Sequence, residues 1–225
     1  MDGEYYHVFN RGVDKRKIFL NDRNYEKFLF LMGVCNDRMS LLNSTYHYRG
    51  LASIESYFKG RERNKLVDII SFCLMPNHFH LLLKQVDEKG ISKFLQKIST
   101  GYTMYFNNKN DRNGSLFQGT FKAIHIDHDK YLKHLINYIH SNPLEIIESK
   151  WKEDGITDLV TAYNFIKNYK WSSLSDYFGS KKFSMLIDSS RLINIGYDSR
   201  SIKDWISKDV KDSNVLEEIL PYTFL

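Results

Sequence analysis

Two histidines separated by one residue, His78 and His80, are the pair in this sequence best suited to hold a metal ion. They follow a Met-Pro-Asn turn and begin the apolar run HFHLLLKQ, which predicts a strand over residues 78–85. Residues i and i+2 of a strand face the same side, so both imidazoles project together while Phe79 points to the opposite face. Paired imidazoles are a natural metal platform. The alternative is that they are ordinary histidines on a sheet surface.

A hydroxyl and an amide lie on one predicted helix that ends at an Asn-Pro stop. Tyr138 follows Tyr131 by seven residues and precedes Asn142 by four, so the three share a face. A tyrosine hydroxyl, with an ordinary pKa of about 10, suits transesterification of a phosphodiester because phosphotyrosine keeps the bond energy for rejoining. A divalent cation nearby would polarise the phosphoryl group and stabilise the departing 3′ oxygen. Tyr138 could instead be a core aromatic.

Hydrophobic periodicity and turn residues indicate the elements that must position these groups. Strands are predicted over residues 5–9, 68–74, 78–85 and 116–126, and helices over 22–37, 91–108 and from Asp127 or Asp129 to His140. Weaker helical patterns cover 156–168 and 171–179. This order is that of an α+β fold with an antiparallel sheet.

Composition narrows the class of protein. The chain has 225 residues, 42% of them apolar, a net charge of +5 and 15% aromatic residues. The charge favours an anionic partner, and the aromatics favour single-stranded nucleic acid, on whose bases they can stack. Cys35 and Cys73 lie in apolar runs and indicate a reducing compartment. Without a signal peptide or a long apolar run, the expected location is the cytoplasm, with no membrane partner.

Six blocks in order resemble the HUH single-tyrosine transposases (the IS200-like family), and most closely their REP-associated branch. The blocks are YHVFNRGVDKRKIF, CLMPNHFHLLLK, GYTMYFN, GSLFQGTFKA, YLKHLINYIHSNPLE and WSSLSDYFG, which cover most of residues 5–180. The resemblance implies a ferredoxin- or RRM-like HUH nuclease core, an antiparallel sheet with helices on one face. It implies a domain over residues 1–180, with 40–65 as an insertion and 181–225 as an extension of unknown role.

The resemblance also implies roles for single residues. His78 and His80 would bind Mg²⁺ or Mn²⁺, Asn142 would complete the metal shell, and Tyr138 would be the nucleophile, with Tyr102 and Tyr105 as rivals. The implied substrate is single-stranded DNA beside a hairpin, and a homodimer remains open. Basic residues in or beside the blocks are the predicted DNA contacts: Arg11, Arg16, Lys17, Lys97, Arg112 and Lys122. Thr120 stands where relatives usually have Arg, which puts one phosphate contact in doubt.

Three other functions remain open from the sequence. A domesticated relative would keep the fold and hairpin binding without transposition. A non-catalytic RNA- or DNA-binding module would also use a sheet with exposed aromatics, although stacking alone needs no paired histidines. A metal hydrolase using only the histidines is disfavoured, because few carboxylates cluster near them in the sequence.

Overall fold

A four-stranded antiparallel sheet forms the centre of the molecule, in a computed structural model that describes residues 3–39, 54, 56–57, 59–60, 62–188 and 199–208. Its strands are β1 (Tyr5–Arg11), β2 (Val67–Met75), β3 (His78–Gln85) and β4 (Lys122–Ile126), in the spatial order β2-β3-β1-β4. With helix α1 (Asp22–Cys35) between β1 and β2 and helix α3 (Gly90–Lys109) between β3 and β4, this is the ferredoxin-like arrangement. The predicted α+β fold with an antiparallel sheet is confirmed.

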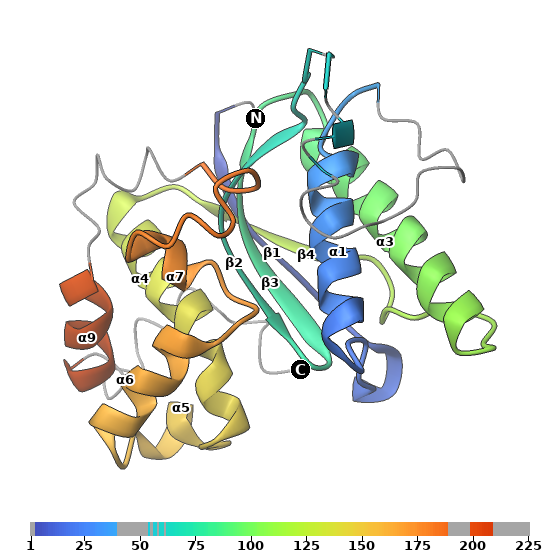
Figure 1. The fold of residues 1–225 in the computed structure, drawn as a ribbon. Helices are drawn as coiled ribbons and strands as arrows, with labels where there is room; N and C mark the ends of the chain where they lie inside the picture. The colour runs from blue at the N-terminus through green and yellow to red at the C-terminus, as the bar shows by residue number, and fades with distance from the viewer. Residues whose placement is uncertain are drawn as a thin grey trace.

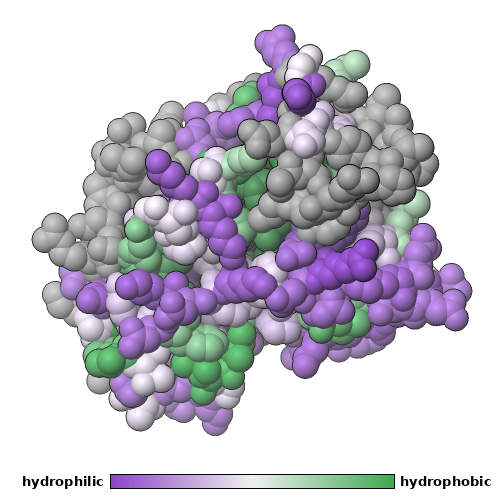
Figure 2. Space-filling view, in the orientation of Figure 1, coloured by the Kyte–Doolittle hydropathy of each residue, from purple (hydrophilic) through white to green (hydrophobic). Residues whose placement is uncertain are grey.

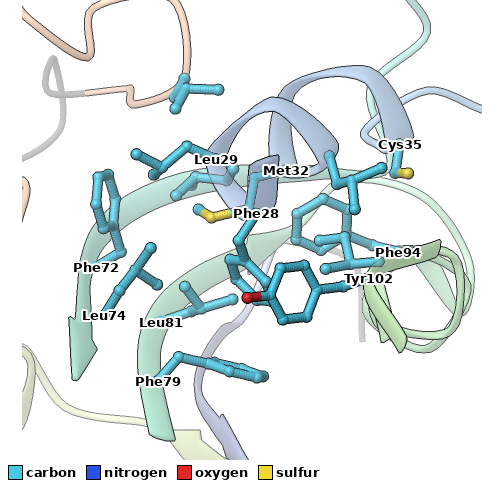
Figure 3. Packing of buried hydrophobic residues seen from close by; sticks show 14 of the residues in the cluster. Phe28, Leu29, Met32, Cys35, Phe72, Leu74, Phe79, Leu81, Phe94 and Tyr102 are labelled. Atoms are coloured by element: carbon cyan, nitrogen blue, oxygen red, sulfur yellow. The ribbon is translucent and has the colours of Figure 1, made fainter. Parts of the chain in front are cut away.

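Helices α1 (Asp22–Cys35) and α3 (Gly90–Lys109) cover one face of the sheet (Figure 1). Every second residue of β3 faces them, so Phe79, Leu81 and Leu83 are fully buried in this layer. Figure 3 shows the ring of Tyr102 inside the same core, and its centroid lies 5.1 Å from that of Phe28 in an edge-to-face contact. The alternation predicted for β3 therefore holds on this side.

A second layer of helices covers the opposite face, in addition to the helices that the sequence predicted on one face. It is built around α4 (Asp129–Ser141), and Figure 1 shows it on the left of the sheet. The other elements of this layer are η2 (Asn142–Ile146), α5 (Trp151–Asp154), α6 (Leu159–Asn168), α7 (Leu174–Tyr177) and α9 (Ser199–Lys208). The physical reason is that Ile70, Cys73 and Leu82 put an apolar surface on this face too, and α4 buries it.

The predicted strand over residues 116–126 is wrong in its first half. Only β4 is a strand, and the preceding segment bends at Gly119, whose φ is +69°. Phe117 makes a single antiparallel bridge to Gly12 before that bend. The glycine breaks the extended run because a positive φ is incompatible with a strand.

The two segments of unassigned role are described only in part. Most of the predicted insertion over residues 40–65 lies outside the described residues; within it, Ile54 packs against Gly33 of α1. In the C-terminal extension, Ile187 makes a parallel bridge to Ile69 of β2, and Trp205 of α9 packs edge-on against Trp151 at 5.9 Å. The described parts of the extension therefore pack on the core of the molecule.

The surface shown in Figure 2 is mostly hydrophilic, with several apolar areas. Figure 2 shows hydrophobic atoms gathered at the lower left, over α5 and α6. Large exposed apolar side chains of η2, the residue after it and α6 are Ile146, Ile147, Leu159 and Val160. Among the described residues, no helix combines the length and the apolar character needed to cross a bilayer.

Candidate active site

The two histidines lie at the start of β3, in the middle of the sheet and on the face covered by α4. His78 pairs with Arg11 of β1, and His80 pairs with Phe9 of the same strand. Their ring centroids are 5.0 Å apart and the ring planes are nearly perpendicular, at 89°. Flanking strands hold both backbones, so the side chains project together from a rigid platform, as the i, i+2 spacing predicted.

Each histidine ring has one nitrogen engaged by a neighbouring side chain. The Nδ1 atom of His78 lies 2.7 Å from Oδ1 of Asn77, and because that oxygen can only accept, Nδ1 carries the proton. The Nδ1 atom of His80 lies 3.0 Å from Nε2 of His7, a fully buried residue of β1. When Nδ1–H of His80 donates to His7, both histidines keep an Nε2 lone pair available for a metal ion.

Both histidines are held in the neutral form that metal binding needs. Desolvation by the surrounding protein, and then the positive charge of Lys152, lower the pKa of His78 to about 3, while the neighbouring Asn142 side chain acts in the opposite direction. Burial lowers the pKa of His80 well below its ordinary value of 6.5, with His78 and His7 adding to the effect. At neutral pH no proton has to leave either ring before a cation binds.

Tyr138 comes to the histidines from α4. Its ring centroid lies 5.6 Å from that of His80, edge to face at 86°, and the residue is 1% exposed. The hydroxyl oxygen lies 3.4 Å from Nζ of Lys152, and Tyr138 lines the same pocket as both histidines. The structure thus brings together the predicted nucleophile and the predicted metal ligands.

Asn142 has the features of a third ligand. Its Nδ2 donates to the main-chain oxygen of Tyr138 at 2.8 Å, which sets the orientation of the amide. Its Oδ1 is buried and has no hydrogen-bond partner, an arrangement that costs about 1–3 kcal/mol unless something coordinates the oxygen. No group of three or more His, Cys, Asp or Glu side chains suited to a metal occurs in the described part of the chain. Two imidazoles with an amide oxygen form a donor set that fits a divalent cation such as Mn²⁺.

An open pocket of about 510 Å³ extends from the histidines and Tyr138. Two of the predicted DNA contacts, Arg11 and Lys122, line it, together with the amides of Asn77 and Gln118. Arg11 is oriented by a 2.6 Å hydrogen bond from its Nε to Oε1 of Gln118. Thr120, where an Arg was expected, also lines the pocket.

The other predicted DNA contacts lie outside this pocket. Arg16 and Lys17 follow β1 in a segment bound to the β2–β3 turn, where the N–H of Ile18 donates to the Pro76 oxygen at 2.8 Å. On the α1/α3 side, Nζ of Lys97 donates to the main-chain oxygen of Asp37 at 2.7 Å. Arg112 donates from Nη1 to Oδ1 of Asn107 at 3.0 Å, in the loop after α3. The structure therefore brings two of the six predicted residues to the pocket.

The rival tyrosines lie on the other side of the sheet from the histidines. Tyr102 is fully buried in the α1/α3 core, and its hydroxyl donates to the Ile18 main-chain oxygen at 2.6 Å. Burial raises the pKa of Tyr102 far above its ordinary value. The hydroxyl of Tyr105 accepts a hydrogen bond from Nδ2 of Asn24 at 3.2 Å. Neither ring lies beside His78 or His80.

The sequence alone did not point to Lys152, which lies in the short helix α5, ten residues after Asn142. Its neighbourhood, SKWKED, is typical of a charged surface, and no spacing rule links it to Tyr138. Lys15 is a second pocket residue that the sequence did not indicate. It lines the pocket from the segment after β1, where its backbone has a φ of +56°. Only the packing of α5 and of the loop after β1 could reveal these two lysines.

Comparison with known proteins finds a matching family model and similar solved structures. The family model described as "Transposase IS200 like" matches residues 5–142, more than half of the chain. The structure described as "Structure of the REP associates tyrosine transposase bound to a REP hairpin" matches with a TM-score of 0.49 and 13% identity, covering 84% of this chain and 90% of that chain. No curated protein matches. The range matched by the family contains both histidines, Tyr138 and Asn142, and ends before Lys152.

Proposed function

The chain belongs to the family of IS200-like transposases, and on that premise we propose that it cuts and rejoins single-stranded DNA through a covalent bond to Tyr138. The observation that carries the proposal is the meeting of Tyr138 with His78 and His80 in one pocket. These residues come from α4 and β3, and their packing sets a buried tyrosine edge-on against one of two paired imidazoles.

In the proposed reaction, Oη of Tyr138 attacks a backbone phosphorus, and the bond from that phosphorus to the 3′ oxygen breaks. The DNA end that carries the phosphate stays on the tyrosine, and the other end leaves with a 3′-hydroxyl. Attack by that hydroxyl on the phosphotyrosine reverses the step and rejoins the strand. No external energy source is needed, because one phosphoester bond replaces another.

His78, His80 and Asn142 would hold a divalent cation next to the scissile phosphate, and the proposed ion is Mg²⁺ or Mn²⁺. When bound, the ion supplies Lewis acidity, which polarises the phosphoryl group and neutralises charge on the departing 3′ oxygen. The support for this ligand set is the neutral state of both rings and the partnerless buried oxygen of Asn142.

The proposed substrate is an extended single strand, recognised beside a hairpin. A tyrosine seated on a helix against the sheet can be reached by an extended strand but not by an intact duplex. Arg11 and Lys122 line the pocket and can contact phosphates on either side of the cut, which makes affinity depend on salt. Membership of the REP-associated branch, action as a homodimer and location in the cytoplasm are parts of the same proposal.

The test is a cleavage assay on single-stranded DNA from the flanks of the gene, with each hairpin included and labelled at the 5′ or 3′ end. Wild-type protein with Mn²⁺ is expected to give a covalent protein–DNA adduct and a free 3′-hydroxyl end. EDTA and Tyr138→Phe are each expected to abolish the adduct. Tyr131→Phe, which removes a hydroxyl from the same helix, is the matched control and is expected to keep it.

Each other outcome has a defined meaning. An adduct that survives Tyr138→Phe would transfer the nucleophile to Tyr102 or Tyr105. Tight hairpin binding without cleavage in Mg²⁺ or Mn²⁺ would favour a domesticated DNA-binding protein that keeps the fold but does not transpose. Cleavage in EDTA would remove the metal from the proposal.

A further inference from the structure

Lys152 lies beside the reacting atom of the proposed mechanism, although it belongs to an element beyond the family match. It is the second residue of α5, and the first, Trp151, is fully buried in the core of the α4 layer. Trp151 packs edge-on against Trp205 of α9, with ring centroids 5.9 Å apart. Two packed tryptophans therefore fix the backbone that carries Lys152.

The ammonium group lies at the hydroxyl end of Tyr138. Its Nζ is 3.4 Å from the hydroxyl oxygen and 5.2 Å from the ring centroid, so it sits nearer the oxygen than the face of the ring. The Lys152 side chain is 14% exposed, and Nζ also lies 3.7 Å from Oε2 of Glu145. An enclosed lysine with a carboxylate partner is held in place, whereas a surface lysine would sample many rotamers.

A purely structural role explains less of this geometry. Nζ is within cation–π distance of the Tyr138 ring, at 5.2 Å from its centroid, but a lysine that served only this contact would not also need to lie 3.4 Å from the hydroxyl oxygen. Lys152 lines the pocket together with Tyr138 and the two histidines, where a phosphate would sit.

We propose that Lys152 is a catalytic residue, whose ammonium group stabilises the negative charge on Oη of Tyr138 as the tyrosine attacks and again as it leaves. This inference rests on the proposed function. The hydrogen bond from Nζ to Oη is long in the free protein and shortens as charge builds on the oxygen, as is common for catalytic contacts. Glu145 positions Lys152 through their ion pair.

The atoms balance without proton transfer through Lys152, which stays an ammonium throughout. The bond from Oη to phosphorus forms, and the bond from phosphorus to the 3′ oxygen breaks. The phenolic proton leaves to water in the pocket, and the departing 3′ oxygen takes a proton from water. In the rejoining step the same ammonium stabilises Tyr138 as the leaving group.

The experiment measures adduct formation under single-turnover conditions, with Mn²⁺ and a saturating labelled single-stranded oligonucleotide from the gene's flank. Lys152→Met keeps the aliphatic stem against Trp151 and removes the charge; it is expected to slow the reaction by about 100-fold. Lys152→Arg keeps the charge and is expected to recover most of the rate. Lys150→Met removes the same charge from an exposed neighbour and is expected to react like wild type.

Two further measurements separate the role in the reaction from folding and from binding. Thermal unfolding must stay within a few degrees of wild type for the rate to be interpreted, and Lys152→Gln, which also removes the charge, serves where Lys152→Met falls outside that range. Affinity for the same oligonucleotide, measured in EDTA, is expected to change by less than about tenfold, since the substitution removes a single positive charge from the DNA-binding surface.

The outcomes distinguish this inference from the proposed function. If wild type forms the adduct and Lys152→Met forms it at the same rate, Lys152 is not catalytic while the proposed function stands. A defect that appears only in affinity would make Lys152 a DNA contact and overturn the inference. If wild type forms no adduct, the proposed function is wrong, and the inference about Lys152 is wrong as well.

Discussion

At the scale of single residues, the contact made by Nδ1 of His80 decides whether its Nε2 is available to a metal ion. Its Nδ1 meets Nε2 of His7, and the two rings stack at 5.2 Å with an angle of 18° between their planes. Burial lowers the pKa of His7 to about 3, so His7 is neutral and able to accept. The tautomer in which Nε2 of His7 accepts from Nδ1–H of His80 is the one that offers Nε2 of His80 to a metal ion.

The first prediction concerns this contact. Replacing His7 by Leu removes the acceptor, so Nε2 of His80 carries the proton more often and Mn²⁺ affinity is expected to fall by about 10- to 100-fold. Isothermal titration calorimetry with Mn²⁺ and the DNA-free protein measures it. His125→Gln changes an exposed histidine of β4 and is the control. Equal Mn²⁺ affinity in wild type and His7→Leu would show that His7 only fills space.

The second prediction uses the partnerless oxygen of Asn142. Asn142→Asp removes the amide donor to the Tyr138 main-chain oxygen and buries a carboxyl group, so the metal-free protein is expected to unfold at a lower temperature. A carboxylate binds divalent cations more strongly than an amide, so the rise in unfolding temperature with Mn²⁺ should exceed that of wild type. A smaller rise than in wild type would mean that residue 142 does not reach the ion.

At the scale of elements, the sheet separates the α1/α3 core from the side that holds the candidate active site. Alternation along β3 sends Phe79 to the α1/α3 core and the histidines to α4. The same division puts Tyr102 in the core, where its hydroxyl ties α3 to the segment after β1. Tyr102 and Tyr138 both lie on helices that the sequence predicts. They differ in the face of the sheet on which each helix packs, and only Tyr138 lies on the side of the histidines.

The third prediction tests this division. Tyr102→Phe removes the donor to the buried Ile18 oxygen and is expected to lower the free energy of unfolding by about 1–3 kcal/mol, because the carbonyl loses its partner. Chemical denaturation measures the loss. The rate of adduct formation is expected to stay at the wild-type level, since the hydroxyl lies on the far side of the sheet. Loss of the adduct without loss of stability would make Tyr102 a reactive residue.

At the scale of the whole molecule, basic residues are spread over both sides of the sheet, but the pocket collects only some of them. Arg11, Lys15, Lys122 and Lys152 line it, whereas Lys97 is bonded to main-chain oxygens on the α1/α3 side. A net charge of +5 favours an anionic partner over the whole surface, and in the proposed function the pocket is where the DNA backbone would be cut.

The fourth prediction separates these two contributions. Each phosphate of single-stranded DNA that a basic side chain neutralises adds about 0.7 to the salt slope of log affinity, so Arg11→Gln with Lys122→Gln is expected to lower the slope by about 1.4. Lys97→Gln is expected to leave the slope unchanged. Fluorescence anisotropy over a series of salt concentrations measures both. A lower slope in Lys97→Gln would extend the DNA path to the α1/α3 side and support Lys97 as a DNA contact, which is what the sequence predicted for this residue.

Local sequence patterns were sufficient to predict which residues form much of the candidate site. The i, i+2 spacing of His78 and His80 and the one-turn spacing of Tyr138 and Asn142 each act within one element, where backbone geometry sets direction. The central strands and the long helices were predicted to within a few residues for the same reason. The false strand before β4 shows the limit, because one positive φ at Gly119 outweighs an extended-looking run.

The sequence by itself determined the family, the antiparallel α+β fold and the residues that carry the proposed chemistry. Only the tertiary structure decided that α4 packs on the histidine face, that His7 stands behind His80, and that α5 delivers Lys152 to the Tyr138 hydroxyl. The physical reason is the range of the interactions. Periodicity orients side chains within a helix or strand, whereas contacts between elements far apart in the chain depend on how whole apolar faces pack together.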